Sequence, residues 1–138
     1  MTSTKPPYLI DYRLADVIAA IQILGSYEWA SRKIDGWTKK LGKPKSADNW
    51  KVVFKQHPEF FRLSENDEWA SLRWRHGYDR NYDLAQKKEL NEAEIKNLEP
   101  EQKENLTRKS LNPNQIESLM KTAIDLHSST IAQKQEKR

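Results

Sequence analysis

The chain has 138 residues, 36% hydrophobic and 32% charged, enough for one compact domain with an extension. It contains no cysteine, which excludes disulfides, thiol catalysis and cysteine-ligated metal sites. Eight Lys and Arg outnumber four Asp and Glu in residues 1–45, and the rest of the chain is balanced, so the net charge of +4 lies in this first third. The N-terminus has no apolar run suited to secretion, and we expect a cytoplasmic protein.

Aromatic residues occupy only part of the sequence. The five Trp, five Tyr and three Phe all lie between Tyr8 and Tyr82. Because aromatic side chains supply much of the burial in a small core, we expect the core to end near Tyr82. The predicted organisation is a flexible arm (1–10), a folded domain (11–82), a linker with a short helix (83–111), and an amphipathic helix with a basic tail (112–138).

The first half of this domain reads as helical. The first ten residues contain two consecutive prolines, which keep them out of a helix. Apolar residues at helical spacing predict a helix over 12–24, which Gly25 ends. A second predicted helix covers 27–41 and ends at Gly42.

The stretch that follows predicts a short helix and a hairpin. The helix begins at Ser46 or Asp48 and stops before Pro58, because the residue before proline is disfavoured in a helix. Strands are then expected over 60–64 and 68–75. Alternation in the second strand directs Ala70, Leu72 and Trp74 to the core and Trp69, Ser71, Arg73 and Arg75 to solvent.

Three helices followed by a hairpin, with the runs HPEFFRL and WASLRWR, resemble the winged helix-turn-helix superfamily over residues 12–76. The resemblance rests on element order, and it implies a fold more than a function. The predicted fold is therefore α+β and mainly α. It is a three-helix winged-helix-like domain with a C-terminal β-hairpin, followed by a helical extension.

The extension contains two helix starts of the form N-x-x-[E/Q]-I-x-x-L. Asn91 with Glu94, and Asn112 with Gln115, match a helix N-cap and its reciprocal partner. The last helix is expected from Pro113 to near Lys134, with a wide apolar face that must dock on the domain or on a second copy. The residues of this face that we expect to contact a partner are Ile116, Leu119, Met120, Ala123, Leu126 and Ile131.

The first functional hypothesis is DNA binding. In winged-helix proteins the third helix enters the major groove and the hairpin contacts the backbone. The residues expected to contact nucleic acid are Lys39, Lys40, Lys43, Lys45, Asn49, Lys51, Lys55, Arg73 and Arg75. Acidic residues at the tip of the hairpin and Asp48 oppose this hypothesis, because they repel phosphate.

The alternative is a protein-interaction or oligomerisation adaptor on the same fold. Exposed Trp69 would be an anchor, since tryptophan is enriched at interaction hot spots, and the last helix would supply further apolar surface. A capped helix with a basic tail is also typical of the segment before a membrane anchor. A membrane is therefore a partner only if such an anchor follows.

An enzyme is not expected. The three histidines are far apart in sequence, and no H-x-x-x-H, glycine-rich phosphate loop or G-x-S-x-G occurs. Residues 79–83 have the opening of a calcium loop, but positions six and twelve of that loop are Leu84 and Leu90. We expect no cofactor, no metal and no small-molecule substrate.

Overall fold

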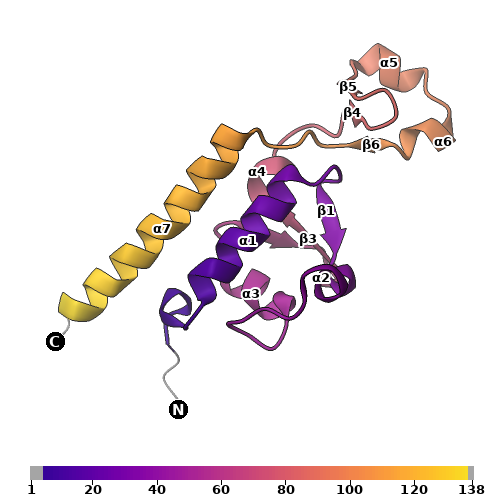
Figure 1. Cartoon of the computed structure of the whole chain (residues 1–138). Helices are drawn as coiled ribbons and strands as arrows, with labels where there is room; N and C mark the ends of the chain where they lie inside the picture. Colours follow the sequence, from indigo (N-terminus) through magenta and orange to yellow (C-terminus); the bar gives the residue numbers. More distant parts are fainter. Residues whose placement is uncertain (1–4, 137–138) are drawn as a thin grey trace.

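The computed structural model describes residues 5–136 and has an α+β fold with two small antiparallel sheets of three strands each (Figure 1). The elements of the first part are η1 (Pro7–Leu9), α1 (Arg13–Ser26), β1 (Ser31–Lys33), α2 (Ile34–Leu41), α3 (Trp50–Gln56), β2 (Phe61–Leu63), β3 (Trp69–Leu72) and α4 (Arg73–His76). They are followed by β4 (Tyr82–Asp83), β5 (Lys88–Glu89), α5 (Glu92–Lys96), α6 (Pro100–Lys103), β6 (Leu106–Thr107) and α7 (Pro113–Glu136).

The first sheet has the strand order β1-β3-β2. Paired residues of neighbouring strands share a face, so the registers Ser31–Ser71 and Arg62–Ser71 place these three side chains on the same side. The opposite face carries Phe61, Ala70 and Leu72, which are all buried. The sheet thus has one face in the core and one outer face.

An aromatic cluster joins α2, α3 and the sheet. Trp37, which is fully buried, lies 5.3 Å from Trp50 and 5.0 Å from Phe54 between ring centroids. Phe54 in turn lies 5.0 Å from Phe61 on β2. Ring pairs at these separations contribute beyond the area they bury, so the cluster fixes α3 against the sheet.

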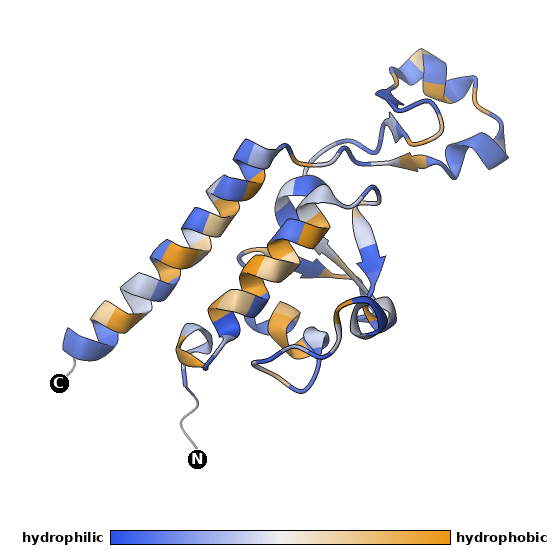
Figure 2. Ribbon diagram, viewed as in Figure 1, coloured by the Kyte–Doolittle hydropathy of each residue, from blue (hydrophilic) through white to orange (hydrophobic). Residues whose placement is uncertain are grey.

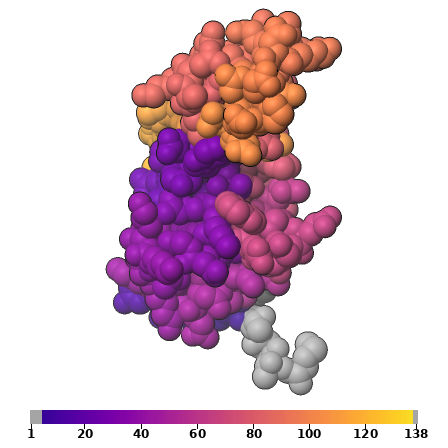
Figure 3. Space-filling view, turned by 90° about the vertical axis from the view of Figure 1, so that its right-hand side faces the viewer, coloured from indigo at the N-terminus to yellow at the C-terminus, as the bar shows by residue number. Residues whose placement is uncertain are grey.

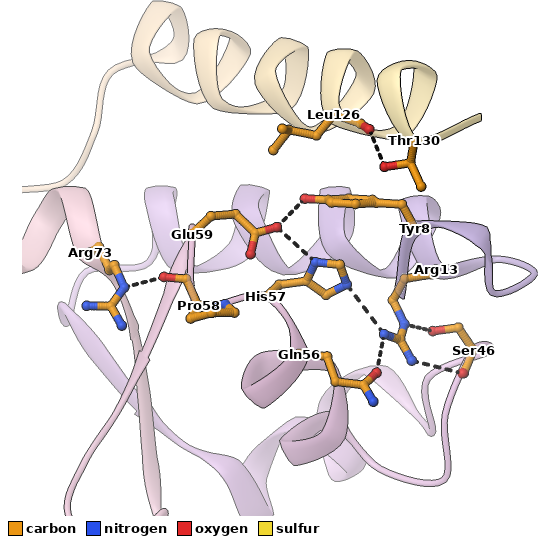
Figure 4. A network of polar contacts seen from close by, with 10 residues as sticks. All are labelled: Tyr8, Arg13, Ser46, Gln56, His57, Pro58, Glu59, Arg73, Leu126 and Thr130. Atoms are coloured by element: carbon orange, nitrogen blue, oxygen red, sulfur yellow. Dashed lines mark hydrogen bonds and ion pairs between the residues drawn. The ribbon is translucent and has the colours of Figure 1, made fainter. Parts of the chain in front are cut away.

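A polar network attaches the N-terminal segment to the end of α3 (Figure 4). The Tyr8 hydroxyl donates to the Glu59 carboxylate at 2.5 Å, and Nδ1 of His57 lies 3.1 Å from the same oxygen. Buried Arg13 donates to Gln56 at 2.6 Å and to Ser46 at 2.8 Å. The predicted flexible arm is therefore wrong from Pro7 onward, because Tyr8 is buried in this network; the arm's first four residues lie outside the described part.

The last helix docks on the domain that precedes it. Helix α7 lies alongside α1 and η1, with Ala123 fully buried (Figure 1). Gly25 permits a close approach, since a Cβ there would lie 2.8 Å from Cγ1 of Ile116. Figure 2 shows α1 largely hydrophobic and α7 with mixed faces, as expected for a buried helix and a surface helix.

Two element predictions in the first part are wrong. Residues 31–33, predicted within a helix, form β1, because pairing with β3 along its whole length outweighs helical patterning. The predicted strand over 68–75 ends at Leu72, and α4 turns Arg75 inward. As a result Trp74 is 38% exposed instead of lying in the core. Ser71 lies on the outer face, as alternation predicts, but is only 5% exposed.

The part predicted as a linker is a small folded unit. Strands β5, β4 and β6 form the second sheet, and α5 and α6 complete an extension that stands beside the main body in Figure 1. Leu90, Leu106 and Leu111 are buried, so burial does not end at Tyr82. Both predicted capping pairs are confirmed, the Asn91 and Asn112 side chains each accepting from a backbone N–H at 2.8 Å.

None of the helices between residues 5 and 136 combines the length and the apolar character needed to cross a lipid bilayer.

Candidate functional site

The lysines predicted to bind nucleic acid lie on α2, on α3 and in the loop between them. All six are exposed: Lys39, Lys40, Lys43, Lys45, Lys51 and Lys55. The Lys43 ammonium lies 3.9 Å from Asp48, and that of Lys55 lies 3.0 Å from Asp67. Asn49 is the N-cap of α3 and accepts from the backbone of Val52. Two of these lysines are therefore partly neutralised by neighbouring carboxylates.

The two predicted arginines differ in exposure. Arg73 is exposed and its Nε donates to the carbonyl of Pro58. Arg75 is fully buried, which corrects its prediction as a surface contact. The reason is local, because the α4 turn replaces the end of the predicted strand and directs this side chain into the protein.

The Arg75 guanidinium joins two segments that are distant in sequence. It donates to the carbonyl oxygens of Leu24, Tyr27, Glu28 and Trp29 on one side and of Arg108 and Lys109 on the other, at 2.6–3.2 Å. Burial lowers the pKa of Arg75 to about 10, so the side chain stays protonated at neutral pH. It holds the segment after α1 beside the segment after β6.

These two segments, with the first sheet, enclose two adjoining hollows. The larger, of about 710 Å³, is lined by Tyr27, Trp29, Ala30, Ser31, Arg32, Lys33, Gly36, Trp69, Arg80, Leu106, Thr107 and Arg108. The smaller, of about 350 Å³, is lined by Ala30, Ser31, Arg62, Ser64, Trp69, Ser71, His76 and Arg108. Four residues line both, so the hollows form one depression, which we call the basic groove. Figure 3 faces the side of the molecule on which these segments come together.

The charged residues that line the basic groove are all cations. They are Arg32, Lys33, Arg62, Arg80 and Arg108, and no Asp or Glu lines either hollow. The Nε of Arg80 donates to the Leu106 carbonyl at 2.9 Å, and that of Arg108 to the Tyr78 carbonyl at 2.8 Å. These bonds fix both side chains while their terminal nitrogens make no hydrogen bond to another described residue. The groove thus presents oriented donors to an anion.

Aromatic rings lie between these cations. Trp69 is 43% exposed and lines both hollows, and Tyr27 and Trp29 line the larger one. The Arg32 guanidinium lies 4.6 Å from the centroid of the Tyr27 ring, within the range of a cation–π contact. An interleaved set of arginines and aromatic rings suits a flat, negatively charged ligand.

His76, in the wall of the smaller hollow, responds to this positive charge. Its pKa lies below the ordinary value because of partial burial and then because of Arg108, Arg62 and Arg73. The positive field in the hollow therefore disfavours protonation of His76, and an anion bound there would reduce this effect. In the part of the chain that is described, no group of three or more His, Asp or Glu side chains is arranged to hold a metal ion.

Sequence reasoning missed most of the basic groove. Its cations come from four separate segments, and only Arg62 had a usable signal, because strand alternation places it on the same face as Trp69. Of the residues expected to contact a partner, Trp69 lines the groove. Ile116, Leu119, Met120 and Ala123 pack against the core instead. Leu126 and Ile131 are 37% and 36% exposed.

Comparisons of the chain with protein-family models, with curated proteins and with solved structures gave no match. The geometry of the basic groove is therefore the basis for assigning a function.

Proposed function

We propose that the protein is a non-enzymatic nucleic-acid-binding module whose contact surface is the basic groove. The observation that carries the proposal is that five Arg and Lys, and no Asp or Glu, line the two adjoining hollows. Phosphate contacts by such residues release counterions and supply most of the affinity for nucleic acid. The exposed ring of Trp69 adds surface on which a base can stack.

The order of elements gives independent support. Helix α1, strand β1, helices α2 and α3, and strands β2 and β3 follow one another, with β1 joining the hairpin in one sheet. This arrangement resembles a winged helix, a fold common among DNA-binding proteins. The fold alone does not identify a function, so the charge distribution must decide where a ligand binds.

The charges favour the basic groove over α3 as the contact surface. Helix α3 presents Lys51 and Lys55, and Lys55 is paired with Asp67 of the hairpin. Glu65 and Glu68 are exposed near the same hairpin tip and would repel phosphate. The groove cations have no carboxylate within ion-pair distance in the described chain.

The proposal predicts a strong dependence of affinity on salt. If all five groove cations contact phosphates, the affinity should fall roughly 100- to 500-fold between 50 and 200 mM salt, with the smaller figure for single strands. Fluorescence polarisation of labelled random-sequence 20-mers, single-stranded and duplex, measures this slope. No binding of either at 50 mM salt would refute the proposal.

Matched charge reversals locate the contact surface. Arg62→Glu changes an exposed cation of the groove, and Lys51→Glu changes an exposed cation of α3. We expect Arg62→Glu to abolish most binding and Lys51→Glu to leave it within about twofold, since repulsion acts mainly within a Debye length of about 10 Å. The reverse result would assign binding to α3.

A second candidate function is a protein-interaction adaptor. The observation that favours it is the exposed apolar row formed on α7 by Ile124 and Ile131, which are seven residues apart on one side of the helix and 45% and 36% exposed. If two copies pair through this row, sedimentation should show a mass that rises with concentration, and Ile124→Asp with Ile131→Asp should abolish the rise. A monomer at every concentration would exclude this form of self-association.

A further inference from the structure

The smaller hollow is lined by a hydroxyl that makes no hydrogen bond within the described residues. Ser71 is on the central strand β3, is 5% exposed, and lines the hollow. Within residues 5–136 no side chain or carbonyl group makes a hydrogen bond with its hydroxyl. Trp37 Nε1 is the buried side-chain atom without a partner among the described residues, so the Ser71 oxygen is accessible from the hollow and free to donate to an acceptor that enters from outside.

The groups around Ser71 select the kind of acceptor. Arg62 lies directly across from Ser71 on β2, and Arg108 reaches the same hollow from the segment after β6. Guanidinium groups bind oxyanions through paired N–H donors, and a phosphate can accept from several donors at once. Since no carboxylate lines the hollow, a phosphate oxygen is the acceptor that its chemistry fits.

The larger hollow adjoins this phosphate position through Trp69. A volume of about 710 Å³ falls within the range of roughly 300–1,000 Å³ found for small-ligand sites. Trp29 and Tyr27 line the same hollow. An unpaired base can lie against these rings, whereas the bases of a duplex are stacked on one another and closed to such contact.

We infer that the basic groove binds single-stranded nucleic acid, with a phosphate held by Arg62, Ser71 and Arg108 and the adjacent unstacked base against Trp69. The inference rests on the proposed nucleic-acid binding and adds the state of the strand to it. Arg32, Lys33 and Arg80 then contact the phosphates that follow along the strand.

The test compares a labelled 12-nucleotide single strand with a duplex of the same sequence at one salt concentration. We expect the single strand to bind at least tenfold more tightly. Trp69→Ala should weaken single-strand binding by about 5- to 150-fold, the range for loss of one base–aromatic stack. Trp69→Phe should restore most of this loss, because it retains an aromatic face.

Two further variants distinguish a specific loss of binding from unfolding of the protein. Trp74→Ala removes a tryptophan of similar exposure, 38%, that lines neither hollow, and it should leave binding unchanged. Ser71→Ala removes only the hydroxyl and should weaken binding about tenfold, the lower range for a hydrogen bond to a charged group. A far-ultraviolet circular dichroism spectrum of each variant should match that of the wild type.

The outcomes separate the inference from the proposed function. Equal binding of strand and duplex, unaffected by Trp69→Ala, overturns the inference and leaves nucleic-acid binding in place. Tighter duplex binding that is lost in Lys51→Glu also overturns the inference and assigns the contact to α3. Absence of binding to both nucleic acids at low salt overturns the inference and the proposed function together.

Discussion

Arg75 is the side chain whose removal should most affect both the fold and the basic groove. It is fully buried, and its guanidinium donates to six carbonyl oxygens from two segments of the chain. The change Arg75→Met keeps an unbranched apolar stem of similar course and removes every donor. The six carbonyl oxygens then lose the guanidinium donors and can replace them only with water.

The loss of stability expected for Arg75→Met is the balance of two opposing effects. A buried acceptor left without a partner costs about 1–3 kcal/mol, but several of these oxygens lie near the surface and can be hydrated. Removal of a buried charge also relieves its desolvation, which offsets part of the loss. We expect the free energy of unfolding to fall by about 3–5 kcal/mol, which corresponds to a drop of roughly 10–15 °C in Tm for a chain of this size.

Urea unfolding followed by tryptophan fluorescence measures this loss. Arg73→Met is the matched control: Arg73 is exposed and bonds one carbonyl, so we expect a change below about 1 kcal/mol. Arg75→Lys should fall near Arg75→Met, because an ammonium has three donors in place of five and cannot reach both segments. A loss below 1 kcal/mol in Arg75→Met would refute the view that this side chain joins the two segments.

Three further predictions concern stability and charge. Gly25→Ala should lower the free energy of unfolding in urea by about 1 kcal/mol, because its Cβ would meet Ile116. In an Ile116→Ala background the same change should stabilise the protein, because only the gain in helix propensity remains. Equal effects in both backgrounds would contradict the contact. Burial of Glu59 raises its pKa, but side-chain hydrogen bonds with His57 and Tyr8 outweigh this effect, so the net pKa is lowered. Wild-type stability should therefore fall as pH drops below about 4.5, the ordinary pKa of Glu. Glu59→Gln should flatten this pH dependence, and an unchanged acid limb would count against the network. Arg62→Gln should raise the pKa of His76 in an NMR titration, because it removes one of the cations that lower it, and a fall would reverse the assignment.

Elements set by local patterning were predicted well from the sequence. The helix expected over 12–24 is α1, and the last helix begins at Pro113, as its capping pair predicts. The third helix also forms, although it begins at Trp50, because Asn49 is the residue that caps it. Such signals lie within a few residues of the feature they determine.

Features that depend on distant partners were not predictable in the same way. Residues 31–33 form a strand only because β3 pairs with them, and α4 forms where the carbonyls of two distant segments converge on Arg75. The prediction of an exposed Arg75 failed for the same reason, since alternation reports which face a residue occupies only while the strand continues. The small second sheet has strands of two residues each, too short to leave a pattern.

The distribution of charge along the chain gives a misleading picture of where the positive surface lies. The whole excess of four positive charges is in residues 1–45, which directs attention to the lysines between α2 and α3. Three of the five groove cations come from the balanced remainder: Arg62, Arg80 and Arg108. The groove is positive because the fold brings together segments whose lining residues include no Asp or Glu. Carboxylates such as Asp48 and Asp67 lie beside the lysines instead. Arg75 holds two walls of this groove together, so the buried arginine that sequence reasoning placed on the surface determines the shape of the proposed binding surface.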